Sequence, residues 1–327
     1  MDYIVKQYHQ HKPKRTLAMN FANFKKVSRH KSDARILVLR KRVHLKRSNM
    51  VEIIHGKAVK LSPLIHRVTA PNSGPMTGLG TNSYIVGTEE LALIDPGPAI
   101  ASHIDAIVEH AAGRLKWILV THTHRDHSPA ARPIAEATGA SLIGNVIAND
   151  GFQDETFTGA TSVKQDDCIH SKDFTIRALL TPGHVSNHVC YLVEEDKILI
   201  TGDHMMQGST VVIIPPAGNM SHYIESLRCM LEYPVDFIAP GHGTLIADPH
   251  KEIKRLIKHR LGREKKILLA IEKNRECRLE ELVPIVYDDV DASLHRWAAL
   301  SLDAHLIKLK AEDKIIENEG AWSMPLT

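Results

Sequence analysis

Four side chains that can bind metal ions occur within six positions of the sequence. They are His122, His124, Asp126 and His127, in the segment Thr121-His122-Thr123-His124-Arg125-Asp126-His127. Imidazole nitrogens and carboxylate oxygens are ligands of zinc, and also of iron and manganese. Single histidines usually pack in a core or lie on a surface, but three rings and a carboxylate at this density have little structural use. The segment therefore predicts a metal site.

The residues on either side of this cluster indicate how it is held. The apolar run 117–120 precedes it, and Ser128-Pro129 follows it. This order predicts a buried strand, a loop and a helix over residues 129–138, with Ser128 as the N-cap, Pro129 at the first helical position and Gly139 at the end. Residues 82–87 and 91–97 are predicted to form two strands, and residues 101–112 a helix. Alternating strands and helices indicate the α/β class.

Three later apolar runs end in the same manner, each in a short loop that contains Gly or Pro together with a His or Asp. The pairs are 174–180 with His184, 197–200 with Asp203, and 235–239 with His242. Rigid strands commonly direct functional residues in their terminal loops toward one site. We therefore expect the four strand ends to converge.

Composition places the chain among ordinary globular proteins. Its 327 residues are 43% hydrophobic and 24% charged, with a mean hydropathy of -0.17. No apolar stretch has the length of a membrane span, so no membrane partner is expected. The four cysteines form no CxxC pair, which predicts reduced thiols in a cytoplasmic chain and no cysteine ligand for the metal.

Charge is distributed unevenly along the chain. Residues 1–50 hold fourteen Lys and Arg against two acids, a net charge of +12, whereas the remainder is mildly acidic at −9. Such a leader can be a mitochondrial targeting segment, a nucleic-acid-binding arm, or a disordered extension with Met50 as the functional start. We favour the disordered extension, because serines are few and no amphipathic helix is evident.

The ligand-type residues resemble the motifs of the metallo-β-lactamase superfamily. The resemblance rests on His122-x-His124-x-Asp126-His127, then His184, Asp203 and His242 in that order, and on Asp95 in Leu93-Ile94-Asp95-Pro96-Gly97. It covers about residues 51–248 and includes all five motifs of the family. It implies a four-layer αβ/βα sandwich with two metal ions at one edge of the sheets.

The same resemblance implies a role for each residue. His122, His124 and His184 would hold one ion, Asp126, His127 and His242 the second, with Asp203 bridging them and Asp95 supporting a ligand from behind. The ions would be two divalent metals, Zn²⁺ first and Fe or Mn as alternatives. They would share a hydroxide nucleophile that Asp126 orients. For Asp203, the alternative is an ordinary turn residue.

Two further histidines lie close to these motifs. His188 is a candidate donor to a developing oxyanion or to a phosphate, and a structural histidine is the alternative. His204 follows Asp203 directly and is predicted to point to the opposite face and to be structural.

The C-terminal segment has a different pattern. Asp248-Pro249 predicts the N-cap and first residue of a helix, and helices at 278–287 and 292–311 precede the short runs 314–317 and 321–324. This order predicts a small winged helix over residues 249–327. The segment His259-Arg260-Leu261-Gly262-Arg263-Glu264 with this tail resembles lactamase-fold proteins that carry a β-lactamase-associated winged helix. That group is related to glyoxalase II and includes a mitochondrial β-lactamase-like endoribonuclease.

Residues 250–275 are rich in basic side chains and could bind single-stranded RNA through its phosphates. The alternative is a solvated helix face in a domain that only packs or forms an oligomer. The ten basic residues are Lys251, Lys254, Arg255, Lys258, Arg260, Arg263, Lys265, Lys266, Lys273 and Arg275.

The leading functional hypothesis is a dinuclear-metal hydrolase that acts on a small ester, thioester or lactone, as glyoxalase II and related lactonases do. A single-strand-specific endoribonuclease is the alternative. Genuine β-lactamase activity is disfavoured, because secreted lactamases of this fold have a signal peptide and lack the bridging aspartate. A non-catalytic nucleic-acid-binding protein is the hypothesis of another class, and the complete ligand set argues against it. The pocket is expected to draw on the basic helix and on Met205, Met206, Gln207, Met220 and His222.

Overall fold

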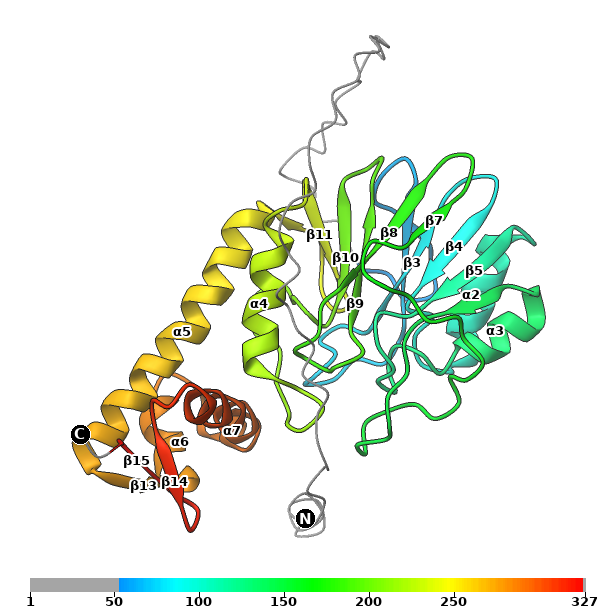
Figure 1. Cartoon of the computed structure of the whole chain (residues 1–327). Coiled ribbons are helices and arrows are strands. Elements are labelled where there is room, and N and C mark those ends of the chain that lie inside the picture. Colours follow the sequence, from blue (N-terminus) through cyan, green and yellow to red (C-terminus); the bar gives the residue numbers. More distant parts are fainter. Residues whose placement is uncertain (1–52, 326–327) are drawn as a thin grey trace, which may run out of the picture. The chain divides into compact units, whose positions relative to one another are not determined.

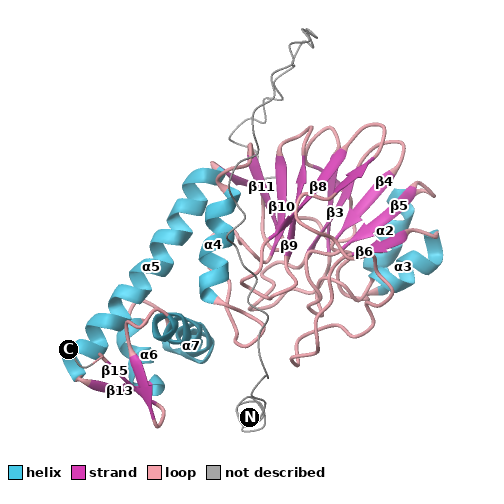
Figure 2. Ribbon diagram, in the orientation of Figure 1, coloured by secondary structure: helices cyan, strands magenta, loops and turns pink. Residues whose placement is uncertain are grey.

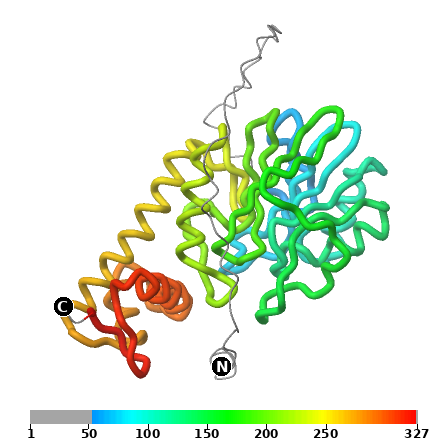
Figure 3. Tube along the Cα trace, viewed as in Figure 1, coloured from blue at the N-terminus to red at the C-terminus, as the bar shows by residue number. Residues whose placement is uncertain are grey.

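The computed structural model of the chain describes residues 53–325, and within that range two mixed β-sheets lie face to face (Figures 1 and 2). The predicted leader, residues 1–50, lies outside the described residues, so its interpretation stays a prediction. Each sheet has six strands and is built from one continuous stretch of chain, which Figure 3 traces by colour.

The first sheet has its strands in sequence order, β1 to β6. β1 to β4 are antiparallel, and β5 and β6 join β4 in parallel. Helix α2 connects β4 to β5, and α3 connects β5 to β6, as parallel strands require a crossover. The bounds are β1 Val59–Lys60, β2 Ile65–Thr69, β3 Asn82–Val86, β4 Leu91–Ile94, α2 Ala101–Ala111, β5 Leu115–Leu119, α3 Ala131–Thr138 and β6 Ser141–Ile143.

The second sheet repeats this plan in the order β12-β11-β10-β9-β8-β7. Its one parallel pair is β10 with β11, and helix α4 makes the crossover between them. The bounds are β7 Cys168–His170, β8 Thr175–Leu180, β9 Val189–Val193, β10 Ile198–Gly202, α4 Met220–Met230, β11 Phe237–Pro240 and β12 Ile246–Ala247.

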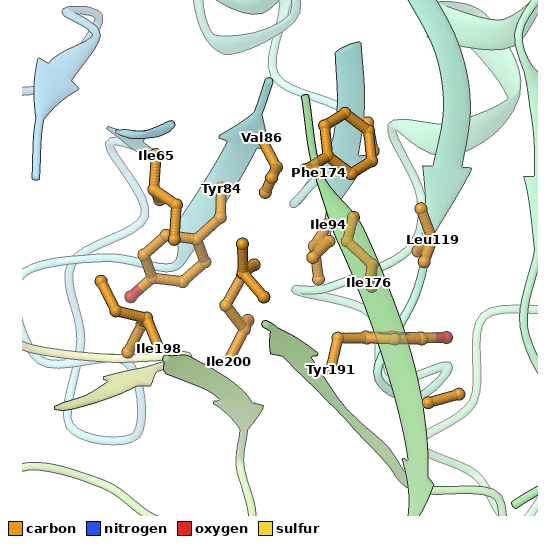
Figure 4. Close-up of a cluster of buried hydrophobic side chains, with 14 of the residues drawn as sticks. Ile65, Tyr84, Val86, Ile94, Leu119, Phe174, Ile176, Tyr191, Ile198 and Ile200 are labelled. Carbon is orange, nitrogen blue, oxygen red and sulfur yellow. The ribbon is translucent and has the colours of Figure 1, made fainter. Parts of the chain in front are cut away.

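Side-chain alternation along the strands assigns residues to layers. In β9, Tyr191 enters the core between the sheets, whereas its neighbours Cys190 and Leu192 point to the helices outside. This is the two-residue period of a pleated strand that is buried on both faces. Figure 4 shows the inter-sheet core, in which Tyr84 and Ile94 of the first sheet meet residues of the second.

The helices form the two outer layers. Ile107 of α2 and Ile134 of α3 pack on the first sheet. Tyr223 and Leu227 of α4 pack on the second. The predicted αβ/βα sandwich is confirmed.

The C-terminal part is a winged helix, as predicted. Its helices pack around a buried cluster and carry a small sheet in the order β13-β15-β14, with a hairpin turn at Glu319-Gly320. The bounds are α5 Pro249–Asn274, β13 Glu276–Arg278, α6 Leu279–Val286, a 3₁₀ turn Ala292–Leu294, α7 His295–Ala311, β14 Ile316–Asn318 and β15 Ala321–Ser323.

The long helix α5 belongs to both parts of the described chain. Ile253 and Leu256 pack into the cluster beneath the second sheet, while Ile267 and Ile271 pack into that of the winged helix. A division of domains at residues 248 and 249 stays a prediction, because α5 links the two cores.

Several local predictions can be compared with the structure. Gly139 does end α3, with φ of 74°. Ser128 is not the N-cap, because its hydroxyl donates to Asp154 Oδ2 at 2.7 Å and α3 begins only at Ala131. Helix α5 begins at Pro249 as expected, but the Asp248 side chain makes no capping hydrogen bond.

Two broader expectations concern cysteines and membranes. All four cysteines are free thiols. Between residues 53 and 325, no helix combines the length and apolarity that crossing a membrane would need.

Candidate metal centre

The four predicted strand ends converge on one edge of the sandwich. The loop after β5 supplies four ligand-type residues, and the loops after β8, β10 and β11 supply one each. The residues fall into three overlapping groups whose ligand atoms lie within 4.8 Å of one another. The first group is His122 with His124 and His184, and the second is Asp126 with His127 and His242. The third, His122 with His127 and Asp203, joins these two.

The first group consists of three imidazoles. His124 Nδ1 lies 3.0 Å from His122 Nε2 and 3.1 Å from His184 Nε2. Burial disfavours the charged rings and lowers the pKa of all three, that of His124 to about 3. Neutral rings expose lone pairs, which is the state that binds metal.

The second group mixes imidazole and carboxylate. Asp126 Oδ2 lies 3.4 Å from His127 Nε2 and 3.3 Å from His242 Nε2. Burial alone would lower the pKa of His242, but the charges of Asp203 and Asp126 outweigh it and raise the pKa to about 10. Without a metal ion, this group therefore holds protons between its rings and its carboxylates.

Asp203, from the third group, lies between the first group and the second. Its Oδ1 is 3.4 Å from His127 Nε2 and 3.3 Å from His242 Nε2, whereas its Oδ2 faces His184 Nε2 at 3.9 Å. One carboxylate thus presents an oxygen to each group, which is the arrangement of a bridging ligand.

Buried polar atoms at this position fit a divalent metal centre. His127 Nε2 and Asp203 Oδ1 form no regular hydrogen bond within residues 53–325, although buried polar atoms are nearly always satisfied. Gly241 keeps the space beside them open, because a Cβ there would lie 2.7 Å from Asp203 Oδ1 and 2.8 Å from His127 Cε1. Four imidazoles, two carboxylates and the shared His122 ring are a donor set that suits zinc, iron or manganese.

In four of the five rings, the nitrogen that faces away from the centre is fixed by a hydrogen bond. His127 Nδ1 donates to Asp95 Oδ2 at 2.9 Å, which places Asp95 behind the ligand as the resemblance implied. The Nδ1 atoms of His122, His184 and His242 bond to Thr121 Oγ1 at 3.0 Å, Val212 O at 2.9 Å and Gly80 O at 3.3 Å. Such partners hold a ring in the orientation that metal binding requires.

His188 and His204 are both buried behind the centre. The His188 ring stacks on that of His122 with centroids 5.1 Å apart, and its Nδ1 bonds to Thr181 Oγ1. The His188 side chain is 1% exposed, which agrees with the alternative of a structural histidine. Direct contact of His188 with a substrate stays a prediction. His204 is fully buried against the Tyr223 ring, in keeping with a structural role.

Sequence reasoning missed other residues at the site. Thr81 Oγ1 donates to Asp126 Oδ2 at 3.2 Å, and no motif near residue 81 signals this contact. The expected pocket residues Met205 and Met220 are instead buried in the core beneath the second sheet, and Gln207 bonds to the backbone nitrogen of Thr244. The pocket expectation was therefore wrong for Met205 and Met220. For Gln207, which is exposed and contacts the loop that follows His242, it stays a prediction.

Comparison with known proteins shows two matching domains. The profile of the metallo-beta-lactamase superfamily matches residues 76–242, and that of the beta-lactamase associated winged helix domain matches residues 279–322. Helix α5 lies between the two matches.

Curated relatives and solved structures agree with this. Lactamase-like protein nscB of Trichophyton rubrum is 32% identical over 213 residues, which are 64% of this chain and 63% of that protein. The beta-lactamase-like protein 2 homolog of Drosophila melanogaster is 28% identical over 80% of this chain and 93% of its own length.

Among solved structures, a beta-lactamase domain protein from Burkholderia ambifaria shares the fold with a TM-score of 0.71 at 18% identity, over 84% of this chain and 97% of its own. A metallo-beta-lactamase family protein from Thermus thermophilus has a TM-score of 0.67 at 20% identity, over 81% of this chain and 100% of its own. Since the superfamily profile spans half of the sequence and all of the strand-end loops described above, the chain belongs to the metallo-beta-lactamase superfamily of metal-dependent hydrolases and carries the associated winged helix at its C-terminal end.

Proposed function

We propose that this hydrolase uses two divalent metal ions, zinc in the first instance, to cleave a small ester, thioester or lactone. The observation that carries the proposal is the position of Asp203, whose two carboxylate oxygens face different ligand groups. A site for a single ion has no need of a carboxylate shared in this way.

The residues around the centre have distinct tasks in such a reaction. Two bound ions supply Lewis acidity for the carbonyl oxygen and lower the pKa of the attacking water. Asp126 has 29% of its side chain exposed, so its carboxylate can orient that water from the solvent side. Thr81 donates to Asp126 Oδ2 and holds the carboxylate in place.

The arrangement of basic residues on helix α5 favours a small substrate rather than RNA at the metal centre. Arg260 and Arg263 are buried, and Arg255 and Lys266 pair with acidic side chains, so four of the ten basic residues are engaged within the protein. At 100° per residue, Lys258 and Lys265 lie on the side of the helix opposite Arg260. They therefore do not line the metal centre.

A second candidate, cleavage of single-stranded RNA, is favoured by one surface feature of α5. A shallow groove of about 500 Å³ runs along its outer side between lysines and apolar residues. It can offer ammonium groups to phosphates and apolar surface to bases. The lining residues are Lys254, Ile257, Lys258, Leu261, Gly262 and Lys265.

A hydrolysis panel on zinc-loaded protein tests the proposal. It contains thioesters, esters, lactones, nitrocefin, phosphodiesters and short single-stranded RNA, with Asp126→Asn as the inactive control. We expect turnover of a carbonyl substrate that Asp126→Asn abolishes. Cleavage of RNA alone, lost in a Lys254→Gln, Lys258→Gln and Lys265→Gln triple variant, would establish the second candidate instead. Protein that binds no zinc, iron or manganese would overturn both and favour a non-catalytic role.

A further inference from the structure

Three successive backbone groups in the segment between β10 and α4 are bound by side chains from other elements. Arg260 Nη2 donates to Val211 O at 2.5 Å, and His184 Nδ1 bonds to Val212 O at 2.9 Å. The Ile213 amide donates to Ser301 Oγ at 3.2 Å. Residues 211–213, which we call the strap, thus link a metal-ligand ring to helices α5 and α7.

Arg260 also contacts a residue that bonds to the backbone beside Asp203. Its guanidinium carbon lies 5.1 Å from the centroid of the Tyr223 ring. The Tyr223 hydroxyl donates to His204 O at 3.0 Å, and His204 follows Asp203 directly. One side chain from α5 therefore supports the backbone on which the bridging carboxylate is mounted as well as the strap.

Burying the Arg260 guanidinium where it is should lower the stability of the fold. The residue is 2% exposed, its Nε has no hydrogen-bond partner, and no carboxylate pairs with it in the part of the chain that the structure describes. Arg263, one turn along the same helix, is also buried but pairs with Asp289 through two hydrogen bonds and donates to Val286 O. A buried charge without a partner lowers the free energy of unfolding. Its presence at this position therefore suggests a role other than stability.

Ser301 fixes the other end of the strap. It lies on α7 and is 5% exposed. Its hydroxyl oxygen accepts a hydrogen bond from the amide of Ile213, whose side chain is fully buried. Because Val211 and Ile213 are both held, the carbonyl of Val212 between them cannot turn away from the His184 ring.

We propose that Arg260 and Ser301 are positioning residues for the metal centre, through which the C-terminal helices fix the strap and hence the ring of His184. The inference rests on the proposed metal site, but not on any choice of substrate. Loss of a partner behind a metal-ligating histidine typically weakens metal affinity about 10–100-fold. We expect this loss of affinity for the ion that His122, His124 and His184 would hold.

The test compares Arg260→Gln with Arg263→Gln in the full chain. Both substitutions remove a buried guanidinium that donates to a backbone carbonyl and lies over a tyrosine ring, Tyr223 or Tyr287. Zinc affinities come from competition with a chromogenic chelator, and unfolding free energies come from urea titration of the same samples. Visible absorption of the cobalt-loaded protein reports the geometry of the ligands.

We expect Arg260→Gln to weaken one of the two ions about 10–100-fold and to change the cobalt spectrum. Arg263→Gln should keep both affinities within about twofold despite a loss of stability. Arg260→Lys, which can still donate to Val211 O, should recover part of the affinity, and Ser301→Ala should weaken the same ion less than Arg260→Gln does. These two milder variants keep the test decisive if Arg260→Gln does not fold.

Two results overturn the inference. One is wild-type-like zinc affinity in Arg260→Lys, Arg260→Gln and Ser301→Ala. The other is an equal loss of affinity in Arg263→Gln, which would show a general effect of destabilisation. Failure of the wild-type chain to bind two ions would instead refute the metal centre itself.

Discussion

Nδ1 of His127 and Oδ2 of Asp95 are 2.9 Å apart, and both side chains are almost completely buried. The same carboxylate accepts the amide and the hydroxyl of Thr121 at 2.7 and 2.8 Å. Asp95 therefore orients both the end of strand β5 and the ring of a candidate metal ligand.

The substitution Asp95→Asn tests this arrangement. Asp95 has φ of 52°, a left-handed conformation that asparagine tolerates. The amide cannot accept all three hydrogen bonds, so we expect zinc affinity of the second group to fall about 10–100-fold. Stability should fall by about 1–3 kcal/mol. Asp154→Asn, which alters a buried carboxylate without contact to a ligand ring, is the control for chelator competition and urea unfolding.

Asp203→Asn separates a bridging carboxylate from a turn residue. The neutral amide removes the charge that both groups share, so we expect one of two bound ions to be lost. Turnover should fall by more than the roughly 10–100-fold that loss of a partner behind a ligand costs. Elemental analysis of the purified variant gives the metal-to-protein ratio. Two tightly bound ions and full turnover in this variant would remove Asp203 from the site.

The two groups should respond differently to pH. The pKa of His242 is raised to about 10 and that of His127 is raised well above its usual value, so at pH 7 an incoming ion must displace their protons. Affinity at this group falls as pH falls, by a factor of about ten per pH unit for each displaced proton.

At the first group the pKa values of His122, His124 and His184 are lowered, so these rings are already neutral. Their affinity should change little between pH 6 and 8. Zinc competition titrations at pH 6, 7 and 8 measure both slopes, and equal slopes at the two sites would contradict the assignment.

Gly241→Ala should disturb the metal centre through its added Cβ alone, because the backbone conformation of Gly241 is one that alanine can adopt. The added Cβ would lie 2.7 Å from Asp203 Oδ1, so the carboxylate or the loop must move. We expect weaker metal binding and lower turnover. Gly262→Ala is the matched control, because nothing lies within 4 Å of its added Cβ. It lies inside α5 and should raise stability by about 0.5–1 kcal/mol with metal affinity unchanged.

The sequence predicted the fold and the site best where a structural or chemical role allows only a few residue types. Apolar runs that end in His or Asp predicted the strands and their convergence, because a buried strand and a metal ligand both restrict composition strongly. The order of His184, Asp203 and His242 then identified the family, and with it the two facing sheets.

Contacts that depend on distant neighbours could not be predicted in this way. Ser128 has the composition of an N-cap, but Asp154 binds its hydroxyl. Thr81 approaches Asp126 only because β3 and the loop after β5 are brought together by the sheet. Arg260 looked like part of a basic surface, and only the packing of α5 shows that it points inward.

The candidate ligands are divided between the two sheets, and each sheet is formed by one continuous half of the lactamase-like region. His122, His124, Asp126 and His127 precede residue 168, where the second sheet begins, and the other three follow it. Neither half of the polypeptide supplies a complete set of candidate ligands, so we expect metal binding to require that both halves are folded. Bound ions would link the two halves, and their removal by a chelator should lower the free energy of unfolding.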